Sequence, residues 1–322
     1  MVVSRSGGVG PVSTDAPELL VIYGPTATGK TRASIALAKR LRGEVISADS
    51  VQVYRGFDIG SAKPTLEERE GVPHHLIDIV NPDEELDAQR FAQLADQAIK
   101  EIRERGHIPI IAGGTGLWIR ALLRGLVELP PVDATIRAEQ EKRVQQWGPE
   151  QSHRHLERVD PLTAAAVHPN DSLRIVRALE VLQQVGRPLG ELRREHALGA
   201  PRYAAQTFVL TLERSLHDRR IERRIQTMLE SGWRDEVSRL HAQWGGDVRA
   251  FGSVGYREVL AAYRRELDEA DLVSSIRKST RIYARRQRTW ASSMSDVTAT
   301  LELDDLLGEP GEPLLLAGNH AP

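Results

Sequence analysis

The stretch Gly24-Pro25-Thr26-Ala27-Thr28-Gly29-Lys30-Thr31 decides the expected fold of this chain. It follows the apolar run Leu19–Tyr23 and precedes a segment in which Ile35, Ala38 and Leu41 recur at helical spacing. A strand, a glycine loop and a helix in this order are typical of a phosphate-binding loop. The glycines let several backbone N–H groups converge on one point, and the helix N-terminus adds a partial positive charge.

Two side chains of this loop carry chemistry of their own. Lys30 is placed to reach phosphate oxygens, and the hydroxyl of Thr31 is placed to bind Mg²⁺. The sequence therefore predicts a polyphosphate site with Mg²⁺ as cofactor. A loop that merely caps a helix is the plainer interpretation, and the motif alone identifies neither the polyphosphate nor what leaves with it.

Composition sets the class of protein. The chain has 322 residues, of which 40% are hydrophobic and 27% charged, which predicts a globular protein of about two domains. It has no apolar run long enough to span a bilayer and no cysteine, so disulfides and cysteine-based zinc sites are excluded. We expect a monomeric, cytoplasmic protein without membrane contact.

Charge is unevenly distributed along the chain. The net charge of −2 argues mildly against nucleic-acid binding. However, arginines cluster within residues 214–224 and, with one lysine, within residues 277–288. Because local fields matter more than the sum, these two segments are candidate anion-binding surfaces.

Strand-like runs alternate with helical segments, which predicts an α/β fold with a P-loop NTPase-like parallel sheet flanked by helices. After the first strand we expect four further strands, at residues 44–48, 74–80, 107–112 and 207–212. Helices are expected at residues 91–105, 216–245 and 256–294.

From residue 131 the pattern is helical and polar with no good strand, which predicts an all-helical insertion domain. The expected parts are a flexible tail at 1–17, a first core part at 18–130, the insertion at 131–200, the completed core with C-terminal helices at 201–300, and a second flexible tail at 301–322.

Three polar residues lie just past predicted strand ends. Ligands of parallel sheets bind at the carboxyl ends of strands, so Lys30, Asp49 and Thr115 should converge. Asp49 is a candidate general base for a substrate amine, or alternatively a residue that helps to hold Mg²⁺.

The strand before Thr115 ends in Gly113 and Gly114 instead of the acidic residue that an ATPase would place there, which counts against a simple hydrolase. These glycines would allow close approach of a ligand, and the Thr115 hydroxyl could then donate to a leaving oxygen. A plain tight turn remains the other interpretation.

Two arginine groups suggest anion binding. Arg220 and Arg224 share a helix face and could clamp a pyrophosphate, or could form a solvated face paired with Glu222 and Glu213. A basic stripe, defined as Arg277, Arg281, Arg285 and Arg288 with Tyr283 and Trp290 interleaved, could follow a nucleic-acid backbone or be an ordinary basic surface.

Several motifs occur together and in order. They are Gly24–Thr31, Ser47–Tyr54, Asp58–Pro64, Pro73–Asp78, Gly113–Leu117, His168–Asp171 and Val254–Arg257. In this combination the chain closely resembles the bacterial tRNA dimethylallyltransferases, also called tRNA isopentenyltransferases, over residues 18 to 295. The phosphate loop alone would be shared with many families, including proteins that bind ATP.

The resemblance implies transfer of a dimethylallyl group from dimethylallyl diphosphate to N6 of the adenosine that follows the anticodon of tRNA. It implies that the residues of the phosphate loop, Gly24, Pro25, Thr26, Ala27, Thr28, Gly29, Lys30 and Thr31, bind diphosphate together with Arg220. Lys30 and Arg224 would stabilise the leaving pyrophosphate, Thr115 would donate to the bridging oxygen, and Asp49 would accept the amine proton.

The same resemblance implies that the adenine is flipped out of the anticodon loop and that the insertion grips the anticodon stem. The implied tRNA contacts are Asp49, Ser50, Val51, Gln52, Thr115, Arg137, Leu173, Arg174, Ile175, Val176, Arg177, Gly252, Ser253, Val254, Gly255, Tyr256 and Arg257. The departures are Thr28, where serine or glycine is usual, and Arg55, where lysine is common.

Three other functions stay open on sequence grounds. They are a small-molecule or nucleotide kinase, a non-catalytic nucleotide-dependent RNA-binding module, and a prenyltransferase that acts on free nucleotides. The missing acid after Ile111 disfavours ATP hydrolysis, and the long helical segment disfavours a compact kinase.

Overall fold

The computed structural model describes residues 18–197, 200–294 and 297–308. The expected N-terminal tail therefore lies outside the described residues. The chain forms two compact units, of which unit 2 comprises Arg124–Arg202 and unit 1 the described residues on either side of it. Within the described part of the chain, none of the helices is both long and apolar enough to cross a membrane.

Unit 1 is built on a six-stranded sheet in the order β3-β2-β4-β1-β5-β6. All neighbouring strands are parallel, which confirms the predicted fold class. The strands are β1 Leu19–Tyr23, β2 Gly43–Ala48, β3 His74–His75, β4 Ile108–Gly113, β5 Ala205–Leu210 and β6 Ala299–Leu301. The run at 74–80 is shorter than expected, because only its first two residues form a strand and Val80 makes an isolated bridge to Tyr54.

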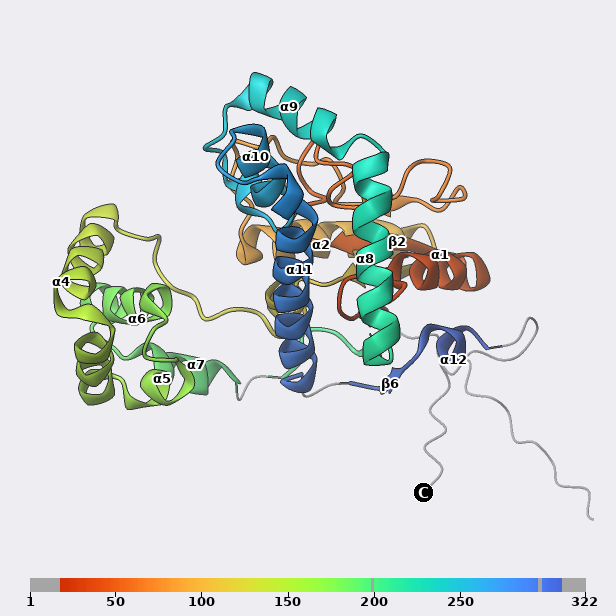
Figure 1. Ribbon diagram of the computed structural model, residues 1–322. Coiled ribbons are helices and arrows are strands. Elements are labelled where there is room, and N and C mark those ends of the chain that lie inside the picture. Colours follow the sequence, from red (N-terminus) through yellow and green to blue (C-terminus); the bar gives the residue numbers. More distant parts are fainter. Residues whose placement is uncertain (1–17, 198–199, 295–296, 309–322) are drawn as a thin grey trace, which may run out of the picture. The chain divides into compact units, whose positions relative to one another are not determined.

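Helices flank this sheet, and further helices of unit 1 extend away from it (Figure 1). In unit 1 they are α1 Lys30–Leu41, α2 Ala88–Glu104, α3 Gly116–Arg124 (which ends at the boundary with unit 2), α8 Arg214–Glu230, α9 Trp233–Trp244, the short 3₁₀ helix η1 Arg249–Gly252, α10 Tyr256–Tyr263, α11 Glu269–Ser292 and α12 Leu303–Leu307. The long helices expected at 216–245 and 256–294 are each divided. Gly232, with φ 94°, separates α8 from α9, and a turn containing Arg265, with φ 61°, separates α10 from α11.

One core cluster joins α1 to the sheet. Ile35 and Leu37 of α1 are buried against Leu20 and Ile22 of β1, which point to the same face of the sheet. Arg42 ends α1 in the left-handed conformation, and Gly43 begins β2. A Cβ on Gly43 would lie 2.8 Å from the carbonyl oxygen of Ile108, so close strand packing accounts for this glycine.

The expectation of a flexible tail from residue 301 is wrong for its first residues. β6 pairs with β5, and Leu303 and Leu306 of α12 are buried in the core cluster that α1 forms with the sheet. Apolar burial fixes this segment to the sheet. Residues 309–322 of the expected tail lie outside the described residues.

Unit 2 is helical and has its own core. Its helices are α4 Ala134–Val159, α5 Pro161–Ala166, α6 Ser172–Val185 and α7 Leu189–Ala197. Asp171 caps α6 by accepting the N–H of Arg174 at 3.2 Å, and Gly186 ends the helix with φ 74°. Gly148, with φ 75°, kinks α4 just before Pro149. Leu156, Ile175 and Ala178 are completely buried in the core of this unit.

Candidate active site

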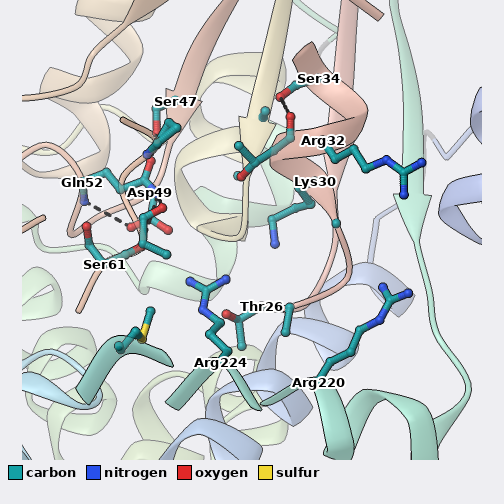
Figure 2. Close-up of a pocket in the computed structure, with 18 of the residues that line it drawn as sticks. Thr26, Lys30, Arg32, Ser34, Ser47, Asp49, Gln52, Ser61, Arg220 and Arg224 are labelled. Atoms are coloured by element: carbon teal, nitrogen blue, oxygen red, sulfur yellow. Dashed lines mark hydrogen bonds between the residues drawn. The ribbon is translucent and has the colours of Figure 1, made fainter. Parts of the chain in front are cut away.

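A cavity of about 580 Å³ lies in unit 1 at the carboxyl ends of the central strands. Its walls come from the phosphate loop after β1, from Asp49 after β2, from the end of β4, and from α8 and α11. Figure 2 shows Lys30 and Arg224 pointing toward one another in this cavity, with Asp49 and Gln52 on one side and Arg32 and Arg220 on the other. One wall is thus carboxylate and amide, and the other is cationic.

The phosphate loop has the geometry that its glycines predict. Gly24 adopts φ 157°, and a Cβ there would meet the carbonyl oxygen of Leu210 at 2.6 Å. Gly29 adopts φ 99°, which favours glycine. The buried Thr28 hydroxyl donates to the carbonyl oxygen of Pro25 at 2.9 Å, so the unusual residue at position 28 stabilises the loop from within.

Two helices that are distant in the sequence hold the backbone of Thr26. Its N–H donates to Oε1 of Gln287 on α11 at 2.8 Å. Its carbonyl oxygen accepts a hydrogen bond from Nε2 of His217 on α8 at 2.7 Å, while Nδ1 of His217 faces Arg288 at 3.2 Å. Because Arg288 can only donate, His217 carries its proton on Nε2. Burial lowers the pKa of His217, which favours this neutral form.

Five cationic side chains line the cavity: Lys30, Arg32, Arg220, Arg223 and Arg224. Burial, together with the nearby positive charge of Arg224, lowers the pKa of Lys30 to about 7, although Asp49 acts in the opposite direction. Burial likewise lowers the pKa of Arg224. Lys30 and Arg224, which burial disfavours in the charged form and which form no ion pair with a described residue, are suited to a polyanionic ligand.

The ion pairs with Glu222 and Glu213 that a solvated arginine face on α8 would have are not formed, although Arg220 itself is exposed. Glu222 pairs with Arg277 at 3.1 Å, and Glu213 caps α8. In the described part of the chain neither Arg220 nor Arg224 forms an ion pair. Both line the cavity, together with the phosphate loop.

Asp49 is anchored at one oxygen and open at the other. Its Oδ1 accepts the N–H of Val51 at 2.9 Å and that of Gln52 at 3.3 Å. No described residue donates a hydrogen bond to Oδ2, and Asp49 lines the cavity. Gln52 in turn donates to the carbonyl oxygens of Ser61 and Ala62, so the loop at 57–63 supports this wall.

The glycines at the end of β4 and after it are required by packing within the protein. A Cβ on Gly113 would lie 2.1 Å from the carbonyl oxygen of Ala48, and one on Gly114 would lie 2.0 Å from Nε2 of Gln287. Trp290 similarly covers Gly116. The protein itself therefore fills the space beside these glycines, and Thr115 of this turn is not among the residues that line the two cavities.

A second cavity of about 240 Å³ adjoins the first. Asp49, Arg224 and Tyr283 line both, so these residues stand where the two cavities meet. Ser50, Val51, Gly252, Ser253 and Val254, all expected to contact tRNA, line the second cavity.

Of the other residues in unit 1 that are expected to contact RNA, two are buried and one is exposed. Tyr256 is fully buried and donates from its hydroxyl to Glu236 at 2.6 Å, and Gly255 is buried against Trp233. Their role is structural. Arg257 is exposed on α10, where it contacts Glu258 at 2.6 Å.

The residues in unit 2 that are expected to contact RNA also include both buried and exposed side chains. Ile175 and Val176 are buried in the core of that unit, so their side chains are not RNA contacts. Leu173 is 81% exposed and Arg174 is exposed beside Asp171. Arg137 and Arg177 both pair with the buried Glu180.

Sequence reasoning missed four residues of the site: Arg32 and Tyr283, which line the cavity, and Gln287 and His217, which hold the phosphate loop. Tyr283 was expected on a basic surface stripe, yet it faces the cavity, and burial raises its pKa. Two members of the stripe pair across to α8, Arg277 with Glu222 and Arg281 with Asp218 at 3.0 Å. Helical spacing alone held no signal for these contacts.

Comparison with known proteins agrees with this geometry. The model of the family described as IPP transferase matches residues 52–294. The chain belongs to the IPP transferase family. Similar members of this family include the tRNA dimethylallyltransferase of Sorangium cellulosum (strain So ce56), which is 47% identical over 273 residues, 85% of this chain and 87% of the relative. The tRNA dimethylallyltransferase of Anaeromyxobacter sp. (strain K) is 48% identical over 272 residues, covering 84% and 89%.

Solved structures of the family are also similar. The full-length tRNA isopentenylpyrophosphate transferase of Bacillus halodurans has a TM-score of 0.66 at 39% identity, covering 89% of this chain and 90% of that one. A eukaryotic dimethylallyltransferase, described as acting on tRNA, has a TM-score of 0.75 at 29% identity, covering 88% and 73%.

Proposed function

We propose that this chain transfers a dimethylallyl group from dimethylallyl diphosphate to N6 of the adenosine 3′ to the anticodon of tRNA, releasing diphosphate. The observation that carries the proposal is the polarity of the cavity, where the phosphate loop and unpaired cations face Asp49 in one space. Membership of the IPP transferase family and relatives that are named tRNA dimethylallyltransferases support it.

The cationic wall would hold the leaving group. As the bond between the allylic carbon and the bridging oxygen breaks, negative charge develops on the diphosphate. Lys30, Arg220 and Arg224 line the cavity where this charge would form and would stabilise it. The diphosphate would in turn favour the protonated form of Lys30.

Asp49 would act on the other substrate. The adenine amine forms the new nitrogen–carbon bond and loses one proton, which the free Oδ2 of Asp49 would accept as general base. The Oδ1 contacts with Val51 and Gln52 would keep the carboxylate oriented during this step.

The residues present fit Mg²⁺. The hydroxyl of Thr31 lines the cavity and makes no hydrogen bond to another described residue, and Mg²⁺ bound to substrate phosphates needs few protein ligands. Thr31 would hold the ion, which when bound neutralises diphosphate charge.

The second cavity would receive the flipped adenine. The two cavities meet at Asp49, Arg224 and Tyr283. A base and a prenyl diphosphate could therefore approach each other from different sides.

A transfer assay tests the proposal. Purified protein with labelled dimethylallyl diphosphate and Mg²⁺ should label unmodified tRNA that carries adenosine after the anticodon. Label on free AMP instead of tRNA, or phosphate transfer from ATP, would reject the proposal in favour of one of the alternatives.

A matched pair of variants tests the base. Asp49→Asn keeps an acceptor for the N–H groups of Val51 and Gln52 but cannot take a proton, so we expect a loss of about 10²- to 10⁴-fold in kcat with tRNA affinity retained. Asp83→Asn, at an exposed position, is the control. Near-normal transfer by Asp49→Asn would refute the assignment.

A further inference from the structure

Gln287 joins two loops that border the candidate active site. It is buried on α11, with 3% of the residue exposed. Its Oε1 accepts the N–H of Thr26 in the phosphate loop at 2.8 Å, and its Nε2 donates to the carbonyl oxygen of Gly114 at 3.0 Å. Its own carbonyl oxygen accepts the Tyr23 hydroxyl at 2.9 Å, which holds this turn of α11 against β1.

The two loops carry different parts of the expected chemistry. The phosphate loop leads directly into Lys30 and Thr31, and Gly114 directly precedes Thr115. We propose that Gln287 is a positioning residue that fixes the spacing between the phosphate loop, which would bind the leaving diphosphate, and the turn that carries Thr115. This proposal rests on the proposed function for the identity of the diphosphate.

Only a primary amide of this length satisfies both loops. Glutamine offers one acceptor and one donor on a single planar group, whereas glutamate offers no donor and methionine neither group. The bond to Gly114 is buried and that to Thr26 is partly buried, so loss of either leaves a backbone group without its protein partner.

Gly114 is matched to this amide. A Cβ at position 114 would lie 2.0 Å from Nε2 of Gln287. Gly114 is not in the left-handed region that would itself favour glycine, so the contact with Gln287 is what excludes a side chain there. The glycine and the glutamine thus form one unit.

The carbonyl oxygen of Thr26, in the next peptide group, is held by His217 at 2.7 Å. Two successive peptide groups at Thr26 are therefore held, and the loop can shift relative to Thr115 only if one of these bonds breaks. A misplacement of about 1 Å in an active site can cost about 100-fold in rate.

A double-mutant cycle tests the inference. The variants are Gly114→Ala, Gln287→Ala and the pair together, with Arg286→Ala, at an exposed neighbouring position of α11, as control. Gln287→Glu is the conservative variant, because it keeps the acceptor for Thr26 and loses only the donor to Gly114. For each we would measure the affinity for inorganic pyrophosphate with Mg²⁺ by calorimetry, kcat and both KM values, and the thermal midpoint.

We expect each single alanine variant to lower kcat about 100-fold and to weaken pyrophosphate binding, while KM for tRNA stays unchanged. The double variant should be no worse than Gln287→Ala, because the new methyl group enters the space that the amide vacates. Gln287→Glu should also lower kcat, and because it places a buried carboxylate against the carbonyl oxygen of Gly114, its kinetics are compared at a temperature where it is fully folded.

Unchanged kcat and pyrophosphate affinity in Gln287→Ala, or effects that simply multiply, would overturn the inference. The inference would also be overturned if the losses of kcat and of pyrophosphate affinity in all variants followed the fraction of unfolded protein. If the wild type binds pyrophosphate but does not use dimethylallyl diphosphate, the proposed function fails, and the pyrophosphate arm of the cycle still decides the role of Gln287.

Discussion

The backbone N–H of Ser50 donates to Oγ1 of Thr115 at 3.1 Å, which ties the loop after β2 to the turn after β4. The N–H of Thr115 also donates to the carbonyl oxygen of Ala48 at 3.2 Å. The Thr115 oxygen thus accepts from Ser50, and Tyr283 of α11 lies within hydrogen-bonding reach of the same hydroxyl.

This relationship predicts the effect of two substitutions at position 115. Thr115→Val removes the acceptor for Ser50 and the donor for substrate, so we expect kcat to fall by about 10²-fold. Thr115→Ser keeps both and should retain most activity. Steady-state kinetics of both variants check this, and equal rates for valine and serine would show that the hydroxyl has no role.

Lys30 should make the ligand-free protein more stable as pH rises. Burial lowers its pKa to about 7, against about 10.4 in an unfolded chain, so the unfolded state binds the extra proton between these values. Stability from this group therefore increases with pH through that window. Lys30→Met should raise the thermal midpoint near pH 7 and reduce its rise with pH. A variant less stable than the wild type would contradict the prediction.

Diphosphate binding should take up a proton. Near pH 8 Lys30 is mostly neutral in the ligand-free cavity, and an adjacent polyanion favours its charged form. Binding enthalpies of pyrophosphate in two buffers of different ionisation enthalpy measure this uptake. After the protonation change of pyrophosphate itself is subtracted, the uptake should approach one proton in the wild type. The Lys30→Gln variant should show no such uptake. Equal uptake by both proteins would assign the proton elsewhere.

Glu236 should be a major determinant of stability in unit 1. This buried carboxylate accepts the N–H groups of Asp58, Ile59 and Gly60 at 2.8 to 3.3 Å, as well as the Tyr256 hydroxyl. Glu236→Ala leaves these donors without a partner, so we expect a loss of more than about 3 kcal/mol in the free energy of unfolding. Urea denaturation measures it, with the exposed Glu230→Ala as control, and a loss no larger than the control's would refute it.

The C-terminal helix α12 should contribute to the core. Leu306 is 1% exposed, and Leu303 beside it contacts Gly29 of the phosphate loop. Leu306→Ala should cost about 2–5 kcal/mol. Asp304→Ala, on the exposed side of the same helix, should cost little. Matching midpoints for the two variants in urea would show that α12 is not part of the core.

Sequence reasoning was most successful where the signal is local. The phosphate loop is one contiguous motif whose glycines and lysine act through their own backbone, and its geometry could be predicted. Asp49 and Thr115 could be placed as well, since parallel strands bring their carboxyl ends to one edge. Both residues do meet there, joined through Ser50. The fold class followed from the same alternation of strands and helices.

Tertiary structure alone decided which helix faces meet these loops. Helical spacing grouped Tyr283 with an outer basic stripe, whereas the packing of α11 turns Tyr283 and Gln287 toward the cavity and leaves Arg285 exposed. Likewise, the glycines after β4 suggested room for a ligand, but Ala48, Gln287 and Trp290 fill that room.

The sequence by itself thus determined the parallel sheet, the phosphate loop and the strand-end residues, because each depends on neighbours in the chain. Only the tertiary structure decided how that loop is held. Its partners, His217 and Gln287, lie 191 and 261 residues from Thr26, and the direction of each side chain depends on the packing of a whole helix.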